Sequence, residues 1–221
     1  MTSATQRLSD SIQDYLKEIY KLQAESGRAT TSAIAERMDV AASSATAMVK
    51  KLTALALAAH EPYRGVVLTK AGEAVAIEVI RHHRLLEQYL AETLGLSIDA
   101  VHAEADRLEH ALSEELEARI DASLGYPTHD PHGDPIPDAE LRIDTQALGS
   151  LEALAEGEEA TVRRVPDGDP DLLRYLDGLG LVPGQRVRLR ASAPFEGPLT
   201  VEVDGRESAI SRDLAARISV A

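Results

Sequence analysis

Apolar residues recur at three- and four-residue intervals through the N-terminal quarter of the chain, which is the spacing of amphipathic helices. Gly27 marks the end of the first helix, and Thr30 or Thr31 is placed to cap the second. Two short strand-like runs follow around a turn at Pro62–Gly65. The predicted elements are helices at residues 9–25, 31–38 and 43–55 and strands at Ala56–Glu61 and Val66–Thr69. This order predicts a winged helix-turn-helix, a DNA-binding fold.

The pattern changes twice further along the chain. Two long helical patterns, at residues 71–94 and 101–125, are separated by a break at Gly95–Ser97. A segment rich in Pro, Gly and Asp follows. From Leu151 short alternating runs predict a small β-barrel with strands EATVRRV, GQRVRLRA, LTVEVDG and ARISV and one helix at residues 170–181. The fold class is therefore mainly α with a small β part. The predicted domains are 1–72 (DNA binding), 73–138 (helical), 139–150 (tether) and 151–221 (barrel).

Charge is distributed unevenly between these domains. The net charge is −14, but residues 1–80 contain nine basic and nine acidic residues, so the whole excess lies beyond them. A neutral N-terminal domain can still contact DNA locally. The absence of cysteine excludes zinc–thiolate and iron–sulfur sites. No apolar run resembles a signal peptide or a membrane span, so we expect a cytoplasmic protein without a membrane partner.

Metal-ligating residue types cluster in the two long helical patterns. His102, Asp106, Glu109 and His110 have offsets of 0, 4, 7 and 8, which would place them on one helical face. His83 and Glu87 form a second pair one turn apart. Nitrogen and oxygen donors of this kind suit a divalent transition metal, although a charged stripe is more often a solvated surface. A di-metal hydrolase or oxidase would use the same residues, but the winged helix argues against an enzyme.

The third predicted helix would be the recognition helix. Its outward face carries small hydroxyl and methyl groups. Such groups contact thymine methyls and phosphates, but they cannot make the paired hydrogen bonds to base edges that distinguish one base from another. Lysines on this face and the arginine of the wing would contact phosphates. Ordinary helix surface is the alternative explanation for each of them. The residues predicted to contact DNA are Ser43, Ser44, Thr46, Ala47, Lys50, Lys51 and Arg64.

Six stretches together resemble the diphtheria-toxin-repressor family of metal-dependent regulators. They are SIQDYLKEIYKL, AIAERMDVAASSATAMVKKL, LTKAGE, IRHHRLLEQYL, VHAEADRLEHALSEELEARI and DPHGDPIP. The resemblance implies an SH3-like domain in place of the small barrel, a homodimer, and metal acting as co-repressor on double-stranded operator DNA of metal-homeostasis genes. It adds Ser11 and Thr31 as looser phosphate contacts.

Carried over by position, the resemblance implies two metal ions per subunit. The main site would use Asp14 with Asp106, Glu109 and His110. The second would use His83, Glu87 and His102, with Asp169 as a candidate from the SH3-like domain. Carboxylates at positions 14 and 106 resemble the manganese-type branch, because iron-type members have sulfur ligands there. Mn²⁺ is therefore the first choice and Fe²⁺ the second, with an iron-selective or zinc-sensing regulator as the alternative.

One position departs from the manganese-type pattern. Members of that branch have a Glu three residues after the aspartate that matches Asp14, and this chain has Lys17. A cation cannot ligate a cation. In that branch this Glu bridges a two-metal cluster, so the resemblance does not imply such a cluster here. It implies a site with a layout closer to that of the iron-type members.

The apolar stripes of the two long helical patterns predict the dimer interface. Leu86, Leu90, Leu108, Leu112 and Leu116 form stripes too large for one thin hairpin to cover. We therefore expect a homodimer through residues 85–124.

Overall fold

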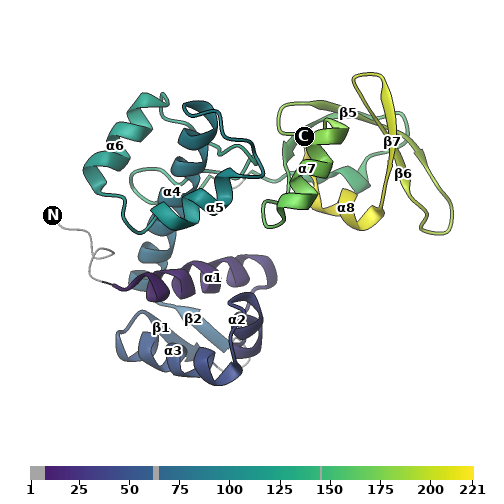
Figure 1. Cartoon of the computed structure of the whole chain (residues 1–221). Helices are drawn as coiled ribbons and strands as arrows, with labels where there is room; N and C mark the ends of the chain where they lie inside the picture. The colour runs from purple at the N-terminus through teal and green to yellow at the C-terminus, as the bar shows by residue number, and fades with distance from the viewer. Residues whose placement is uncertain (1–7, 62–64, 145) are drawn as a thin grey trace. The chain divides into compact units, whose positions relative to one another are not determined.

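The computed structural model describes residues 8–61, 65–144 and 146–221, and these divide into two compact units. The first unit contains residues up to His83, with 107–119 and 137–142. The second contains 84–106, 120–136 and 143–221. Figure 1 shows helices in the N-terminal half and a β-rich C-terminal part, so the predicted class, mainly α with a small β part, is confirmed.

The N-terminal part of the first unit is a winged helix-turn-helix. Gly27, with φ of 72°, ends the first helix, and the Thr30 hydroxyl caps the second by accepting from the Ala33 N–H at 3.1 Å. The two strands pair antiparallel, from Ala58 opposite Leu68 to Glu61 opposite Gly65. The elements are α1 (Asp10–Ser26), α2 (Thr31–Arg37), α3 (Ala42–Ala54), β1 (Ala58–Glu61) and β2 (Gly65–Leu68).

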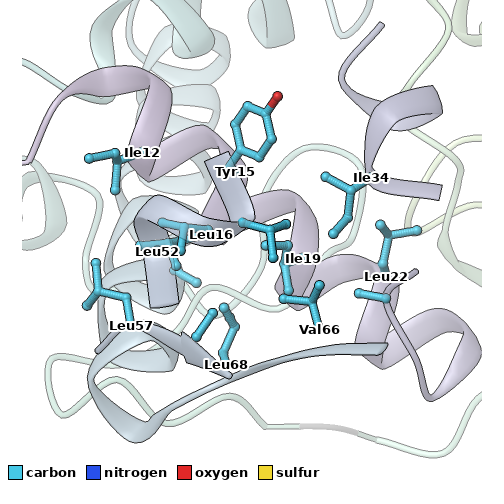
Figure 2. Close-up of a cluster of buried hydrophobic side chains, with 14 of the residues drawn as sticks. Ile12, Tyr15, Leu16, Ile19, Leu22, Ile34, Leu52, Leu57, Val66 and Leu68 are labelled. Carbon is cyan, nitrogen blue, oxygen red and sulfur yellow. The ribbon is translucent and has the colours of Figure 1, made fainter. Parts of the chain in front are cut away.

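The core of this domain holds α1 in place. Leu16 and Ile19 on α1 are fully buried, together with Ile34 of α2 and Leu52 of α3. Figure 2 shows these side chains converging with Val66 and Leu68 of β2. A fully buried leucine contributes about 2 kcal/mol through the hydrophobic effect. Because the inner face of α1 is fixed by this core, the positions of its other side chains are also fixed.

The prediction of one helix over residues 101–125 is wrong. The chain forms α5 (Val101–Leu108) and α6 (Glu114–Ser123), with a turn at residues 109–111 between them. Ser113 begins α6, since its hydroxyl accepts from the Leu116 N–H at 3.3 Å. Glu109 and His110 therefore project from a turn and not from the helical face that their spacing suggested. Helix α4 (Lys70–Glu92) precedes this pair.

The second unit includes a six-stranded antiparallel sheet in the order β3-β8-β4-β5-β6-β7. Its strands and helices surround a buried aliphatic core that includes Leu173, Leu189 and Val201. The elements are β3 (Gly149–Ser150), the 3-10 helix η2 (Leu151–Ala153), β4 (Glu159–Arg164), α7 (Pro170–Leu179), β5 (Arg186–Ser192), β6 (Leu199–Val203), β7 (Arg206–Ile210), α8 (Arg212–Arg217) and β8 (Ser219–Val220).

Two details of this sheet differ from the sequence prediction. Strand β7 was not predicted, because its residues, RESAI, are mainly polar, but the two-residue Asp204–Gly205 turn brings it back against β6. Both turn residues have positive φ, 49° and 76°, as a tight hairpin requires. The predicted last strand is partly helical, since α8 occupies Arg212–Arg217 before β8. The sheet also packs with a residue from outside its own sequence, because Ile98 contacts its core.

Candidate metal centres and the DNA-binding face

Three predicted ligands of the main site come together in the first unit. Asp14 lies on α1, and Glu109 and His110 lie in the turn after α5. One donor atom from each residue lies within 4.8 Å of the others. The His110 Nε2 is 2.9 Å from the Asp14 Oδ1 and 3.5 Å from the Glu109 Oε1. Residues almost a hundred positions apart therefore present nitrogen and oxygen donors to one small volume.

The His110 ring is oriented by a neighbour on α1. Its Nδ1 lies 3.0 Å from the Gln13 Oε1, which only accepts hydrogen bonds. With the Nδ1–H donated to Gln13, the Nε2 atom faces Asp14 and Glu109. The Asp14 carboxylate raises the pKa of His110, against the opposing effect of burial. A metal ion at this site would replace the proton that Nε2 shares with Asp14.

Glu109 is the most buried member of this first site. Its side chain is 1% exposed, and its two oxygens have different partners. Oε1 accepts from the Lys17 Nζ at 2.6 Å, and Oε2 lies 2.6 Å from the His83 Nδ1. The Glu109 backbone carbonyl also lies 3.1 Å from the Nδ1 of His82 on α4. The turn that carries Glu109 and His110 is thus held by contacts to both α1 and α4.

A second group of donors surrounds Glu87 in the second unit. The Glu87 Oε1 lies 3.0 Å from the His102 Nδ1, which joins two residues predicted to share a site. The other oxygen, Oε2, lies 3.6 Å from the Nδ1 of His132. Donor atoms of Glu87, Asp130 and His132 lie within 4.8 Å of one another, and the three side chains are 0–1% exposed.

Asp130 and His132 were missed by the sequence prediction. The available signal was a Pro- and Gly-rich loop at residues 126–140 with two His and three Asp, which the pattern identified as irregular. Among the residues that the structure describes, Asp130 Oδ2 and His132 Nδ1 have no hydrogen-bond partner. The His132 Nε2 lies 2.9 Å from the Ile98 carbonyl, so Nδ1 is the atom turned towards Glu87.

The electrostatics of this second group favour bound protons when no metal is present. Burial raises the pKa of Asp130 to about 8, and the charges of Glu87 and Asp134 add to the effect. For His132, burial acts in the opposite direction, but Glu87 and Asp130 raise its pKa to about 9. Buried carboxylates that hold protons at neutral pH are ready to exchange them for a cation.

Three other predicted ligands have the following neighbours within their own units. Asp106 is half-exposed, and its Oδ2 lies 3.7 Å from the His102 Nε2. His83 lies one turn before Glu87 on α4 and pairs with Glu109 as described above. Asp169 is exposed and caps α7, accepting from the Asp171 and Leu172 N–H groups at 2.9 and 3.3 Å. Their membership of a metal site stays a prediction.

Comparison with protein-family models divides the chain into three matched segments. Residues 7–66 match the iron dependent repressor N-terminal DNA binding domain, and residues 69–138 match the metal binding and dimerisation domain of the same repressors. Residues 149–221 match the FeoA domain. The iron-dependent repressor IdeR of Mycobacterium tuberculosis is 35% identical over 213 residues, which cover 91% of this chain and 92% of that protein. The chain belongs to the diphtheria toxin repressor family.

Solved structures of family members have the same fold along almost their whole length. A manganese-dependent transcriptional repressor in complex with manganese is 40% identical, covers 95% of this chain and 98% of its own, and superimposes with a TM-score of 0.86. The manganese regulator SloR is 33% identical with a TM-score of 0.77, and covers 95% and 97%. As a member of this family the chain is a metal-dependent transcriptional repressor, and the enzyme alternative is not supported.

The helix predicted to be the recognition helix is α3 (Ala42–Ala54), within the segment matched as the DNA-binding domain. All six residues of α3 predicted to contact DNA are exposed: Ser43, Ser44, Thr46, Ala47, Lys50 and Lys51. The Thr46 hydroxyl donates back to the Ala42 carbonyl at 2.7 Å, so its methyl group is the part left for an outside contact. Ser11 is exposed and Thr31 half-buried. Arg64 lies outside the described residues. None of the helices in the described part of the chain is long and apolar enough to span a membrane.

Proposed function

We propose that this protein is a manganese-activated homodimeric repressor that binds operator DNA, with Fe²⁺ as the second choice of metal. The observation that carries the proposal is the convergence of Asp14, Glu109 and His110 on one volume. Two carboxylates and one imidazole are hard and borderline donors, and the chain has no cysteine to supply a soft one. Such a set of ligands favours a hard ion such as Mn²⁺ more than a set that includes sulfur ligands would.

The metal at this first site would act as a link between domains. Asp14 belongs to the DNA-binding domain, whereas Glu109 and His110 belong to the segment matched as metal-binding and dimerising. A divalent ion neutralises the carboxylates and ties α1 to the turn after α5. This would fix the orientation of the recognition helix, which must match its half-site on DNA. A coupling of about 1.4 kcal/mol is enough for a tenfold gain in DNA affinity.

We also propose a second ion in each subunit, centred on Glu87. Asp130 and His132 would be its other ligands, and His102, which is hydrogen-bonded to Glu87, remains a predicted ligand. Asp130 Oδ2 and His132 Nδ1 support this assignment, because both are buried without a hydrogen bond, and their nearest charged groups, Arg84 Nε and Glu87 Oε2, lie 3.7 and 3.6 Å away. Buried polar atoms without hydrogen bonds are costly unless an ion engages them. His83, Asp106 and Asp169 remain predicted ligands, as the sequence suggested.

Proton release tests the second site. Since the pKa values of Asp130 and His132 are about 8 and about 9, both groups hold protons at pH 7, and Mn²⁺ must displace them. Calorimetry in buffers of different ionisation enthalpy should therefore detect proton release on Mn²⁺ binding at pH 7, and the release should decline as the pH rises through about 8 and about 9. The variant Asp130→Ala/His132→Ala should lose one bound ion and that release. Asp134→Ala, a loop neighbour, is the control and should retain the ion.

The dimer is proposed to form through the helical domain. Leu108 and Leu116 are 43% and 49% exposed, which is unusual for leucines flanking a buried Leu112. Leu86 and Leu90, by contrast, are buried within the chain, so the predicted stripe is only partly available for a partner. The two exposed leucines support an apolar contact between subunits. A dimer presents two recognition helices, which suits a two-fold operator.

DNA binding with different metals tests the function as a whole. We expect Mn²⁺ to raise the affinity of the protein for the promoter of a neighbouring metal transporter gene by at least about tenfold, which corresponds to about 1.4 kcal/mol of coupling. Fe²⁺, under anaerobic conditions, should act at higher concentration. Activation by Zn²⁺ alone would identify a zinc sensor, and equal binding without metal would contradict the proposal. Regulation of metal-homeostasis genes from the cytoplasm is part of the same proposal.

A further inference from the structure

Lys17 is a buried cation inside the proposed first metal site. It lies on α1 one turn after Asp14, and its side chain is 7% exposed. Its Nζ donates to the Glu109 Oε1 at 2.6 Å, a short, charge-assisted hydrogen bond. Lysine is almost never buried without a paired anion, because desolvating the ammonium is costly. Its presence among metal ligands therefore requires a reason.

The ammonium engages the same oxygen that a metal would need. Of the two Glu109 oxygens, Oε1 is the one that lies 3.5 Å from the His110 Nε2. An ion held by that nitrogen and by Asp14 would bind Glu109 through Oε1. Oε2 is occupied on the other side by His83 at 2.6 Å. Lys17 and a metal ion therefore compete for one carboxylate oxygen.

The charge of the site also limits how many ions it can hold. Asp14 and Glu109 contribute two negative charges, and Lys17 cancels one of them. A single divalent ion leaves a small positive excess. A second divalent ion would leave three positive charges uncompensated, or two if the predicted ligand Asp106 also joins the site, next to the buried Lys17 and Glu109, which is unfavourable.

We propose that Lys17 is the resident cation of the first metal site. In the metal-free protein it neutralises Glu109 and holds α1 against the turn that carries it. On metal binding it competes for the Glu109 Oε1 and thereby lowers the affinity for the ion. Throughout, it takes the place of a second divalent ion and restricts this site to one. The inference rests on the proposed assignment of Asp14, Glu109 and His110 as the first site.

Lys21 provides a matched control on the same helix. It lies one turn further along α1, its side chain is 29% exposed, and it pairs with Glu18 at 3.5 Å. Substituting Lys21 changes the net charge of the protein as substituting Lys17 does, but does not touch the metal ligands. Any effect of charge alone would appear in both variants.

Removing the ammonium tests the competition. Lys17→Met keeps an unbranched side chain of similar length without the charge. We expect it to bind Mn²⁺ at the first site about tenfold more tightly in calorimetry, because Glu109 no longer has a competing charge-assisted hydrogen bond. The metal-free variant should also melt at a lower temperature than the wild type, whereas Lys21→Met should match the wild type in both measurements. Unchanged Mn²⁺ affinity in a folded Lys17→Met protein would overturn the inference.

Reversing the charge tests the ion count. Lys17→Glu adds a carboxylate where the ammonium was, so equilibrium dialysis should find one more Mn²⁺ per subunit than in the wild type or Lys21→Glu. Low-temperature electron paramagnetic resonance should then show two coupled Mn²⁺ ions. If Lys17→Glu does not fold, the Mn²⁺ affinity of Lys17→Met alone decides whether the inference holds. A folded Lys17→Glu protein with the wild-type ion count would contradict the proposed role of Lys17.

A third variant separates this inference from the function on which it rests. Asp14→Ala/His110→Ala in the otherwise wild-type protein should lose one Mn²⁺ per subunit. If it loses none, the first site itself is misassigned and the inference falls with it. If it loses one while the Lys17 variants behave as wild type, the metal site stands and only the role of Lys17 is refuted.

Discussion

Asp14→Ala is expected to abolish the metal dependence of DNA binding while the protein remains folded and dimeric. Of the three residues that converge on the first site, Asp14 is the one on the DNA-binding domain. Its side chain is 37% exposed, so its loss costs little stability. Glu109 and His110 would remain as a weak metal site without a connection to α1. The gain in DNA affinity on adding Mn²⁺, at least about tenfold for about 1.4 kcal/mol of coupling, should disappear.

The controls for this experiment lie on the same helix. Asp10 is exposed in the first turn of α1, so Asp10→Ala removes the same charge without removing a ligand and should keep the Mn²⁺ response. Asp14→Met replaces a hard oxygen by a thioether and should shift the preference from Mn²⁺ towards softer ions. Operator binding titrated against Mn²⁺ and Fe²⁺ measures both effects. A full wild-type response in Asp14→Ala would mean that the metal acts elsewhere.

Gly133→Ala is expected to have the largest effect on stability and to remove the second metal site with it. Gly133 has φ of 89°, and a Cβ added to it would lie 1.9 Å from the Arg163 carbonyl oxygen on β4. The neighbouring His132 carbonyl accepts from the Val165 N–H at 2.9 Å, so the loop cannot move away without breaking this bond. Strain and overpacking together should cost about 3 kcal/mol of unfolding free energy.

Two other glycines separate the causes of that loss. Gly157 also has a positive φ, 86°, but a Cβ there would meet nothing within 4 Å, so Gly157→Ala should cost only the conformational strain of about 1 kcal/mol. Gly168 has neither a positive φ nor a close neighbour, and Gly168→Ala should be nearly neutral. Urea unfolding of the three variants measures the differences, and equal losses in all three would show that the close approach to β4 is unimportant.

Local pattern was sufficient for the architecture of the DNA-binding domain. Its helices bury one face each, so their apolar residues repeat with the helical period, and Gly27 and Thr30 mark their ends by backbone and capping chemistry. The types of metal ligand could also be predicted, because carboxylate and imidazole side chains cluster within the two long helical patterns. Asp14, Glu109 and His110 were named from sequence, through the resemblance to a family, and the structure brings these three together.

Only the tertiary structure could decide the break after Leu108 and the partners of the ligands. No Gly or Pro marks that break in the sequence. The turn is stabilised instead by contacts of Glu109 with Lys17 and His83, which are distant in sequence. Asp130 and His132 lie in a loop whose irregular backbone has no periodic signal, so their approach to Glu87 depends on packing against the barrel. The spacing of residues along a chain determines which faces an element has. Long-range packing determines which faces meet, and in this protein it places Lys17 and the loop of Asp130 and His132 among the residues of the proposed metal sites.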